Sequence, residues 1–115
     1  MKIGERTIGD VRILDFSGKI ALGEGTMAVR NAVRGLLQNG TKNIVMNLAD
    51  VSSVDSAGVG ELMSAYTTVL NAGGKLMLLN LTKRIQEVLA ITKLLTVFEV
   101  LDNENSIRLR FPSWE

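Results

Sequence analysis

The sequence contains neither cysteine nor histidine. Without cysteine the chain can form no disulfide, no thiolate metal site and no cysteine nucleophile. Without histidine it lacks the commonest general base and the commonest metal ligand of proteins. These absences count against a metal centre and against most acid–base catalysis.

Excess charge and long hydrophobic runs are also missing. Thirteen basic residues stand against twelve acidic ones, a net charge of +1, so no strong field would attract nucleic acid or an anionic membrane. No apolar run approaches the roughly 20 residues of a membrane-spanning helix, and residues 1–10 lack the apolar centre of a signal peptide. We therefore expect a cytoplasmic protein without a nucleic-acid or membrane partner.

What is present fits one α/β domain. The chain has 115 residues, 46% of them hydrophobic, which is typical of a single soluble domain. Short β-type runs alternate with helical periodicities, an order that favours a mainly parallel sheet with right-handed crossovers. The first two runs are separated by Gly9-Asp10, which favours a hairpin with a type II′ turn.

We predict a mixed sheet of about five strands with about four helices over residues 1–110, and a C-terminal tail over residues 111–115. The expected strands are 3–8, 11–16, 44–48, 75–80 and 97–100, and the expected helices are 24–38, about 56–70, 82–92 and a last one capped by Asp102.

The stretch 43–74 organises this pattern. Its strand is a short apolar run, as expected for a strand covered on both faces. Residues 50–55 read as a polar loop. A helix with one apolar face follows and is closed by Gly73, because a left-handed position after a helix favours glycine.

Ser56 lies at or next to the start of this helix, beside Asp55. A helix N-terminus has free N–H groups and a partial positive charge, so it favours an anion such as a phosphate on Ser56. That phosphate would also repel an acidic partner surface. The simpler interpretation, that Asp55 or Ser56 only caps the helix, is the one the residues alone favour.

Two catalytic or ligand-binding interpretations are weaker. The run Val54-Asp55-Ser56-Ala57-Gly58 lacks the first glycine of the G-x-S-x-G nucleophile motif, and no histidine exists for a triad. Residues 23–28 match G-x-G-x-x-A but do not follow directly from the expected strand, as a dinucleotide site requires. A small-ligand or nucleotide binder using this loop remains an alternative.

Two glycines in the first turn of this helix have two possible roles. Gly58 and Gly60 each cost the helix up to about 1 kcal/mol, so they serve either close packing on the sheet or a smooth surface for a partner. Leu22 is expected to point inward from the loop that begins at Lys19. Arg30 and Arg34 are expected on a solvated helix face.

The run from Asn47 to Gly60 resembles the STAS domain family, and in particular the bacterial anti-anti-sigma factors (anti-sigma factor antagonists). Asp55-Ser56-Ala57-Gly58 matches the family's D-S-[SA]-G turn after a strand ending in [ND]-[LF], here Asn47-Leu48. The resemblance extends over nearly the whole chain, including the opening hairpin and the entry to the strand at Lys75.

The resemblance implies a switch between partners rather than an enzyme. The unphosphorylated protein would bind an anti-sigma factor that is a serine kinase of the histidine-kinase-like ATPase type, and so release a sigma factor. Phosphorylation of Ser56 by that kinase would end the binding, and a PP2C-type phosphatase would reverse it. No cofactor is implied.

The partner surface implied by the resemblance surrounds Ser56. Asp55 would assist phosphotransfer or recognition. Family members often carry an aspartate in the region of Ala21 and Leu22, whereas no carboxylate occurs here before Glu24, so the contact with the kinase would differ. A STAS scaffold without a phosphate cycle is the other alternative. The further residues assigned to this surface are Ala57, Gly58 and Gly60, and at its rim Lys19, Leu22, Gly23 and Gly25.

Overall fold

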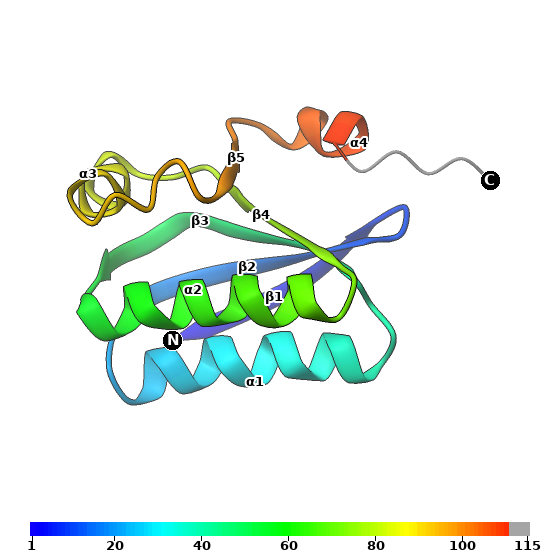
Figure 1. The fold of residues 1–115 in the computed structure, drawn as a ribbon, viewed down its shortest axis with the longest axis horizontal. Helices are drawn as coiled ribbons and strands as arrows, with labels where there is room; N and C mark the ends of the chain where they lie inside the picture. Colours follow the sequence, from blue (N-terminus) through cyan, green and yellow to red (C-terminus); the bar gives the residue numbers. More distant parts are fainter. Residues whose placement is uncertain (111–115) are drawn as a thin grey trace.

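The computed structural model describes residues 1–110, and its five strands form one sheet in the order β1-β2-β3-β4-β5 (Figure 1). The strands are β1 (Lys2–Ile8), β2 (Val11–Ile20), β3 (Asn43–Val54), β4 (Lys75–Leu79) and β5 (Glu99–Leu101). The helices are α1 (Glu24–Gln38), α2 (Ser56–Asn71), α3 (Lys83–Ile91), the 3-10 turn η1 (Glu104–Ser106) and α4 (Ile107–Arg110). The expected α/β domain with a mixed, mainly parallel sheet is confirmed.

The opening hairpin is present as expected. β1 pairs with β2 antiparallel, whereas the β2–β3, β3–β4 and β4–β5 pairs are parallel. Gly9 has a φ of +59° and Asp10 has no positive φ, which is the signature of a type II′ turn.

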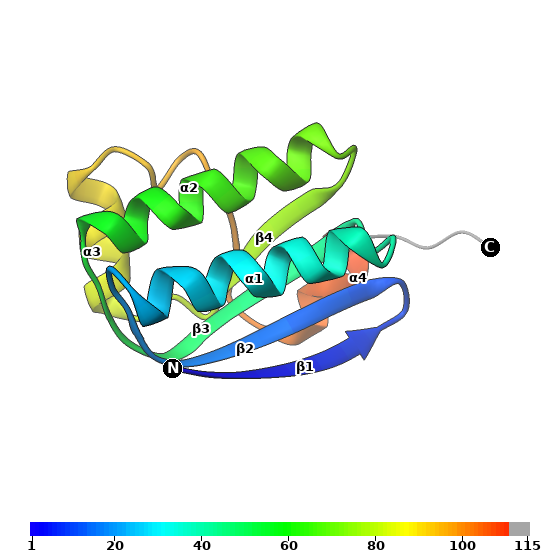
Figure 2. The same cartoon turned by 90° about the horizontal axis from the view of Figure 1, so that it is seen from below.

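Helices α1 and α2 lie side by side on one face of the sheet (Figure 2). The main core lies beneath them and receives Leu14 and Phe16 from β2 and Met46 from β3. The opposite face carries a smaller cluster that includes Ile13 and Val45 and is completed by Ile107 of α4. Both faces of β3 are therefore covered, which explains its nearly continuous apolar run.

The expected loop at residues 50–55 is wrong for residues 50–54, which belong to β3. β3 continues to Val54 and stays paired with β2, with Lys19 opposite Ser53 and Ile20 opposite Val54. Register shifts on β2 accompany this extension. The strand continues because the neighbouring backbone satisfies its N–H and C=O groups, although only some of its side chains, such as Val51, are buried.

The C-terminal third follows the expected order with shifted boundaries. Gly73 ends α2 with a φ of +81°, and Thr82 caps α3 by accepting a hydrogen bond from the Ile85 N–H at 3.2 Å. The last strand covers 99–101 rather than 97–100. Asn103, not Asp102, caps the final turn, since its Oδ1 accepts from the Ser106 N–H at 3.2 Å. The predicted tail, residues 111–115, lies outside the described residues.

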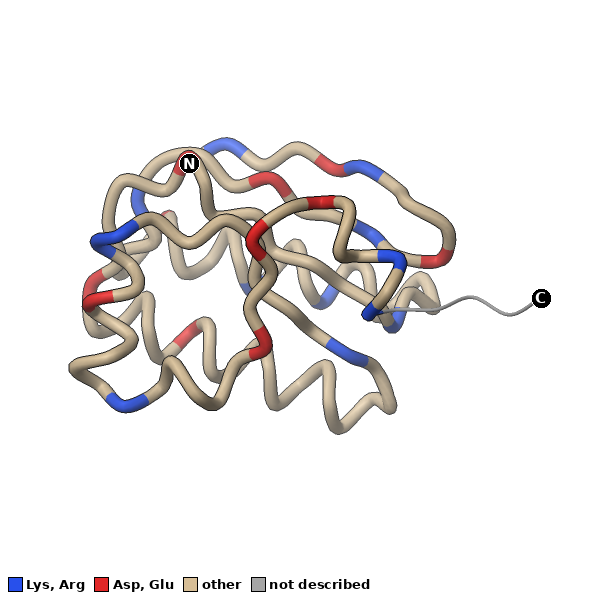
Figure 3. Tube along the Cα trace, turned by 90° about the horizontal axis from the view of Figure 1, so that it is seen from above, with Lys and Arg blue, Asp and Glu red and all other residues tan. Residues whose placement is uncertain are grey.

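Charged residues are distributed over the whole trace without separation by sign (Figure 3). Within the described range, no helix combines the length and the apolar character needed to cross a membrane.

Candidate functional site at the start of helix α2

Asp55 is the N-cap of α2. Its backbone is extended, with φ −89° and ψ −176°, and its Oδ1 accepts a hydrogen bond from the Gly58 N–H at 2.7 Å. This satisfies one of the N–H groups that a helix start leaves unpaired. Ser56 is consequently the first residue of the helix rather than its cap.

The second carboxylate oxygen of Asp55 reaches a different segment. Oδ2 accepts from the backbone N–H of Leu22 at 3.1 Å, in the turn between β2 and α1. Hydrogen bonds from the Leu22 and Gly58 amides hold the pKa of Asp55 below its ordinary value, because they stabilise the charged form. Asp55 therefore fixes the turn at Leu22 to the start of α2.

The Ser56 hydroxyl is free of this network. The side chain is exposed, and none of residues 1–110 forms a hydrogen bond with its hydroxyl. It lies at the positive end of a 16-residue helix. The structure thus presents a serine that an external enzyme can reach.

The glycines near Ser56 divide into two kinds. A Cβ on Gly58 would lie 2.0 Å from the carbonyl oxygen of Ile20, and one on Gly25 would lie 2.4 Å from that of Lys19. Both glycines are buried, and they allow the starts of the two helices to pack closely on β2. Gly60 is exposed, with no atom within 4 Å of an added Cβ, and no packing requirement explains it.

The expectation that Leu22 points inward is wrong. It is 79% exposed, since Ala21 and Leu22 leave the sheet immediately after the buried Ile20. Met27, in the first turn of α1, is 58% exposed. The two helices start at the same end of the sheet (Figure 2), so apolar side chains are available to a partner at the end where Ser56 lies. We call the residues Leu22, Met27, Ser56, Ala57 and Gly60 the Ser56 surface.

Glycines at the start of α1 have a structural explanation. Gly23 is the N-cap and has a φ of +103°, a conformation that favours glycine. Its N–H donates to Thr26 Oγ1 at 3.2 Å. With Gly25 packed against β2, this loop is accounted for without a bound nucleotide. Lys19 is exposed but lies in β2, so the loop does not begin at Lys19 as expected and instead follows Ile20.

Arg30 and Arg34 are exposed on α1, as expected for a solvated helix face. Arg30 also forms an ion pair between the helices, which the sequence did not predict. Its guanidinium lies 2.8 Å from Glu61 Oε1, and the Glu61 side chain is only 5% exposed. A buried carboxylate requires such a partner. Nothing in the spacing of Arg30 and Glu61 reveals the pair, because they are on different helices.

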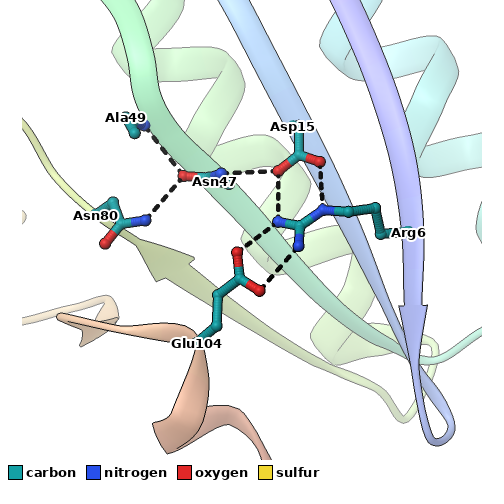
Figure 4. Close-up of polar contacts among 6 residues, drawn as sticks. All are labelled: Arg6, Asp15, Asn47, Ala49, Asn80 and Glu104. Carbon is teal, nitrogen blue, oxygen red and sulfur yellow. Dashed lines mark hydrogen bonds and ion pairs between the residues drawn. The ribbon is translucent and has the colours of Figure 1, made fainter.

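A second polar cluster lies on the opposite face of the sheet and was also missed (Figure 4). The Arg6 guanidinium bridges Asp15, at 2.6 and 2.9 Å, and Glu104, at 2.8 and 2.7 Å. Asn47 donates to Asp15 at 2.7 Å and accepts from Asn80 at 3.3 Å. The cluster ties η1 to the sheet and is separate from the Ser56 surface.

Charge pairing sets the pKa values in this cluster. The hydrogen bonds from Arg6 lower the pKa of both Asp15 and Glu104, and they raise the pKa of Arg6 itself. Partial burial opposes the shift of each carboxyl group without reversing it.

One family model matches nearly the whole chain. The model of the STAS domain family matches residues 3–107. The TM1081 homolog of Thermotoga neapolitana, named for a proposed role as an anti-sigma factor antagonist, is 32% identical over 66 residues. That match covers 57% of this chain and 58% of the relative.

Solved structures show the same fold. The crystal structure of TM1081 from Thermotoga maritima, described with the same proposed role, superposes with a TM-score of 0.86 at 20% identity over 94% of this chain and 92% of that one. Bacillus SpoIIAA in its phosphorylated form gives a TM-score of 0.73 at 17% identity over 96% and 99% of the two chains.

Proposed function

Because this chain belongs to the STAS domain family, we propose that it is an anti-sigma factor antagonist whose partner binding is switched by phosphorylation of Ser56. The unphosphorylated protein binds an anti-sigma factor serine kinase of the histidine-kinase-like ATPase type and thereby releases a sigma factor. A PP2C-type phosphatase restores the binding form. The names of the relatives support the antagonist role, and the geometry around Ser56 supports the switch.

One observation carries the proposal. Ser56 is the first residue of α2 and is exposed, and its hydroxyl has no hydrogen-bond partner within residues 1–110. A kinase can therefore reach it without opening the fold. Exposed Leu22 and Met27 offer apolar contact area, and Gly60 leaves the helix backbone beside them uncovered.

Phosphorylation would change the charge of this surface. A phosphate adds about −1.5 to −2 charge at neutral pH. Asp55, already negative, occupies the Gly58 N–H, so the phosphate adds to the local negative charge and is not simply neutralised by the helix end. Burying such a group against an apolar partner surface is costly, and the complex dissociates.

The hydrogen bonds of Asp55 support a positioning role for this residue in the proposed switch. Both of its oxygens bind backbone N–H groups, so it holds Ser56 and Leu22 in one arrangement that the kinase recognises. Gly58 and Gly25 permit that arrangement, and Lys19 and Gly23 form its edge.

The first test is phosphopeptide mass spectrometry on the protein purified from its own host, in growing and in stressed cells. Phosphate on Ser56 with an occupancy that changes between conditions is the expected result. The partner test compares tagged Ser56→Ala and Ser56→Asp proteins. Only the alanine variant should retain a protein identified by its peptides as a serine kinase of the stated type.

A different outcome would favour the alternative role of a scaffold. Absence of phosphate from Ser56 in every condition, together with equal retention of one partner by both variants, would contradict the switch. Partner binding would then be constitutive.

A further inference from the structure

A shallow apolar groove lies far from the Ser56 surface, at the edge of the sheet formed by β5. Its volume is about 160 Å³, and it is lined by Tyr66, Leu70, Lys75, Leu76, Val97 and Glu99. Leu70 is 56% exposed and Val97 is 38% exposed. Single exposed apolar residues are ordinary, but here two of them face one concavity.

The groove also has an aromatic wall. The Tyr66 ring packs edge to face on Phe98, with 5.4 Å between the ring centroids and an interplanar angle of 77°. Aromatic and apolar walls of this kind favour a further aromatic side chain as the occupant.

The described part of the chain ends beside this groove. Lys75 Nζ donates to the carbonyl oxygen of Arg110 at 3.2 Å. The Arg110 guanidinium forms an ion pair with Glu99. Two groove-lining residues from neighbouring strands thus bind Arg110, the residue directly before the tail.

The sequence that follows is Phe111-Pro112-Ser113-Trp114-Glu115. The chain has one tryptophan, one tyrosine and three phenylalanines, and this short segment contains the tryptophan and one phenylalanine. Four residues span up to about 14 Å when extended, so Phe111 and Trp114 are both within reach of the groove.

We propose that the groove is the docking site of the chain's own segment 111–115, with its aromatic side chains packed against Leu70, Val97 and Tyr66. The occupant follows from the anchoring of Arg110 and from the match between an aromatic segment and an apolar groove. Docking covers apolar side chains next to an edge strand, where exposed apolar surface favours association with other chains. This inference is independent of the switch at Ser56.

Trp114 makes the proposal testable with the intact protein, because it is the only tryptophan. Its emission in the native protein should be blue-shifted relative to N-acetyltryptophanamide in the same buffer and protected from acrylamide. Leu70→Gln and Val97→Gln should each shift the emission to the red and raise the quenching constant. Both side chains are partly exposed, so the variants should keep the wild-type far-ultraviolet circular dichroism.

The matched control is Ile91→Gln, which removes an apolar side chain that is 80% exposed at the end of α3. It should leave the emission unchanged. A direct measurement is a nuclear Overhauser effect between the Trp114 indole and the methyl groups of Leu70 or Val97 in the full chain.

Three results would overturn the proposal. The first is native emission equal to that of the free chromophore and insensitive to the groove variants. The second is an equal shift in the Ile91→Gln protein. The third is protection of Trp114 that disappears on dilution together with a dimer, which would place the tail in a second copy of the chain.

Discussion

The carboxylate of Asp55 hydrogen-bonds the Leu22 amide at 3.1 Å across a sequence separation of 33 residues. Its other oxygen caps α2 through the Gly58 amide at 2.7 Å. One side chain therefore links the helix that begins at Ser56 to the most exposed apolar residue of the Ser56 surface. A change at either end of this link is expected to alter the same contact area.

Replacing Asp55 should loosen that link. Asp55→Ala removes the acceptor of two backbone N–H groups, so we expect a lower urea midpoint and faster amide hydrogen exchange at Leu22 and Gly58 than in the wild type. Asp50→Ala, an exposed residue of β3, is the control. Unchanged exchange at Leu22 in the Asp55→Ala protein would show that the second hydrogen bond does not hold the turn.

Gly58 and Gly60, two residues apart in α2, should respond in opposite directions to replacement by alanine. Gly58→Ala forces a Cβ against the Ile20 carbonyl, and we expect the free energy of unfolding to fall by about 1–3 kcal/mol. In Gly60→Ala the added Cβ has no atom within 4 Å. This substitution should raise the free energy of unfolding by about 0.5–1 kcal/mol, because alanine favours a helix more than glycine does. Urea unfolding of both variants provides the measurement, and equal destabilisation would contradict the division into packing and surface glycines.

The Ser56 hydroxyl should matter for partners and not for the fold. Since it has no hydrogen-bond partner in the described chain, Ser56→Ala should keep the free energy of unfolding within about 0.5 kcal/mol of the wild type. A larger loss measured by urea unfolding would indicate a structural role and would confound the binding comparison with Ser56→Asp.

Leu22 is expected to contribute directly to partner binding. Leu22→Gln should weaken binding of the kinase about tenfold and leave the thermal midpoint unchanged, because the side chain is 79% exposed. Ile91→Gln, equally exposed but outside the Ser56 surface, is the matched control in calorimetry with the purified kinase. The same small effect from both variants would remove Leu22 from the contact area.

The cluster around Arg6 predicts a loss of stability in acid. The pKa values of Asp15 and Glu104 are lower in the folded protein than their ordinary values. As the pH falls, the unfolded chain therefore binds these protons first. The stabilisation is complete above about pH 5, beyond the ordinary pKa values of both carboxyl groups, and it is lost as the pH falls through the lowered pKa values.

A variant isolates the Glu104 part of that effect. Glu104→Gln should cost up to about 1 kcal/mol at neutral pH, the range of partly exposed ion pairs, and the difference from the wild type should shrink in acid. Glu87→Gln, on the exposed face of α3, is the control. A difference that stays constant with pH in urea titrations would exclude the ion pair as its cause.

Much of this protein can be predicted from local sequence. Apolar periodicity and turn residues correctly indicated the hairpin at Gly9, the boundaries of α1 and the caps at Thr82 and Gly73. Asp55 and Ser56 were placed at the start of a helix because capping chemistry acts over a few residues. The D-S-A-G turn, read with the strand before it, also indicated the STAS family.

Only the tertiary structure determined which groups from distant segments meet. Residues 50–54 stay in a strand because β2 pairs with them, and the Cβ clash that requires glycine at position 58 comes from Ile20. The bonds from Asp55 to Leu22, from Arg30 to Glu61 and from Arg6 to Glu104 join residues far apart in sequence. Such contacts depend on register and packing angle rather than on local propensity, so the sequence supplied the chemistry at Ser56 while the fold decided which side chains surround it.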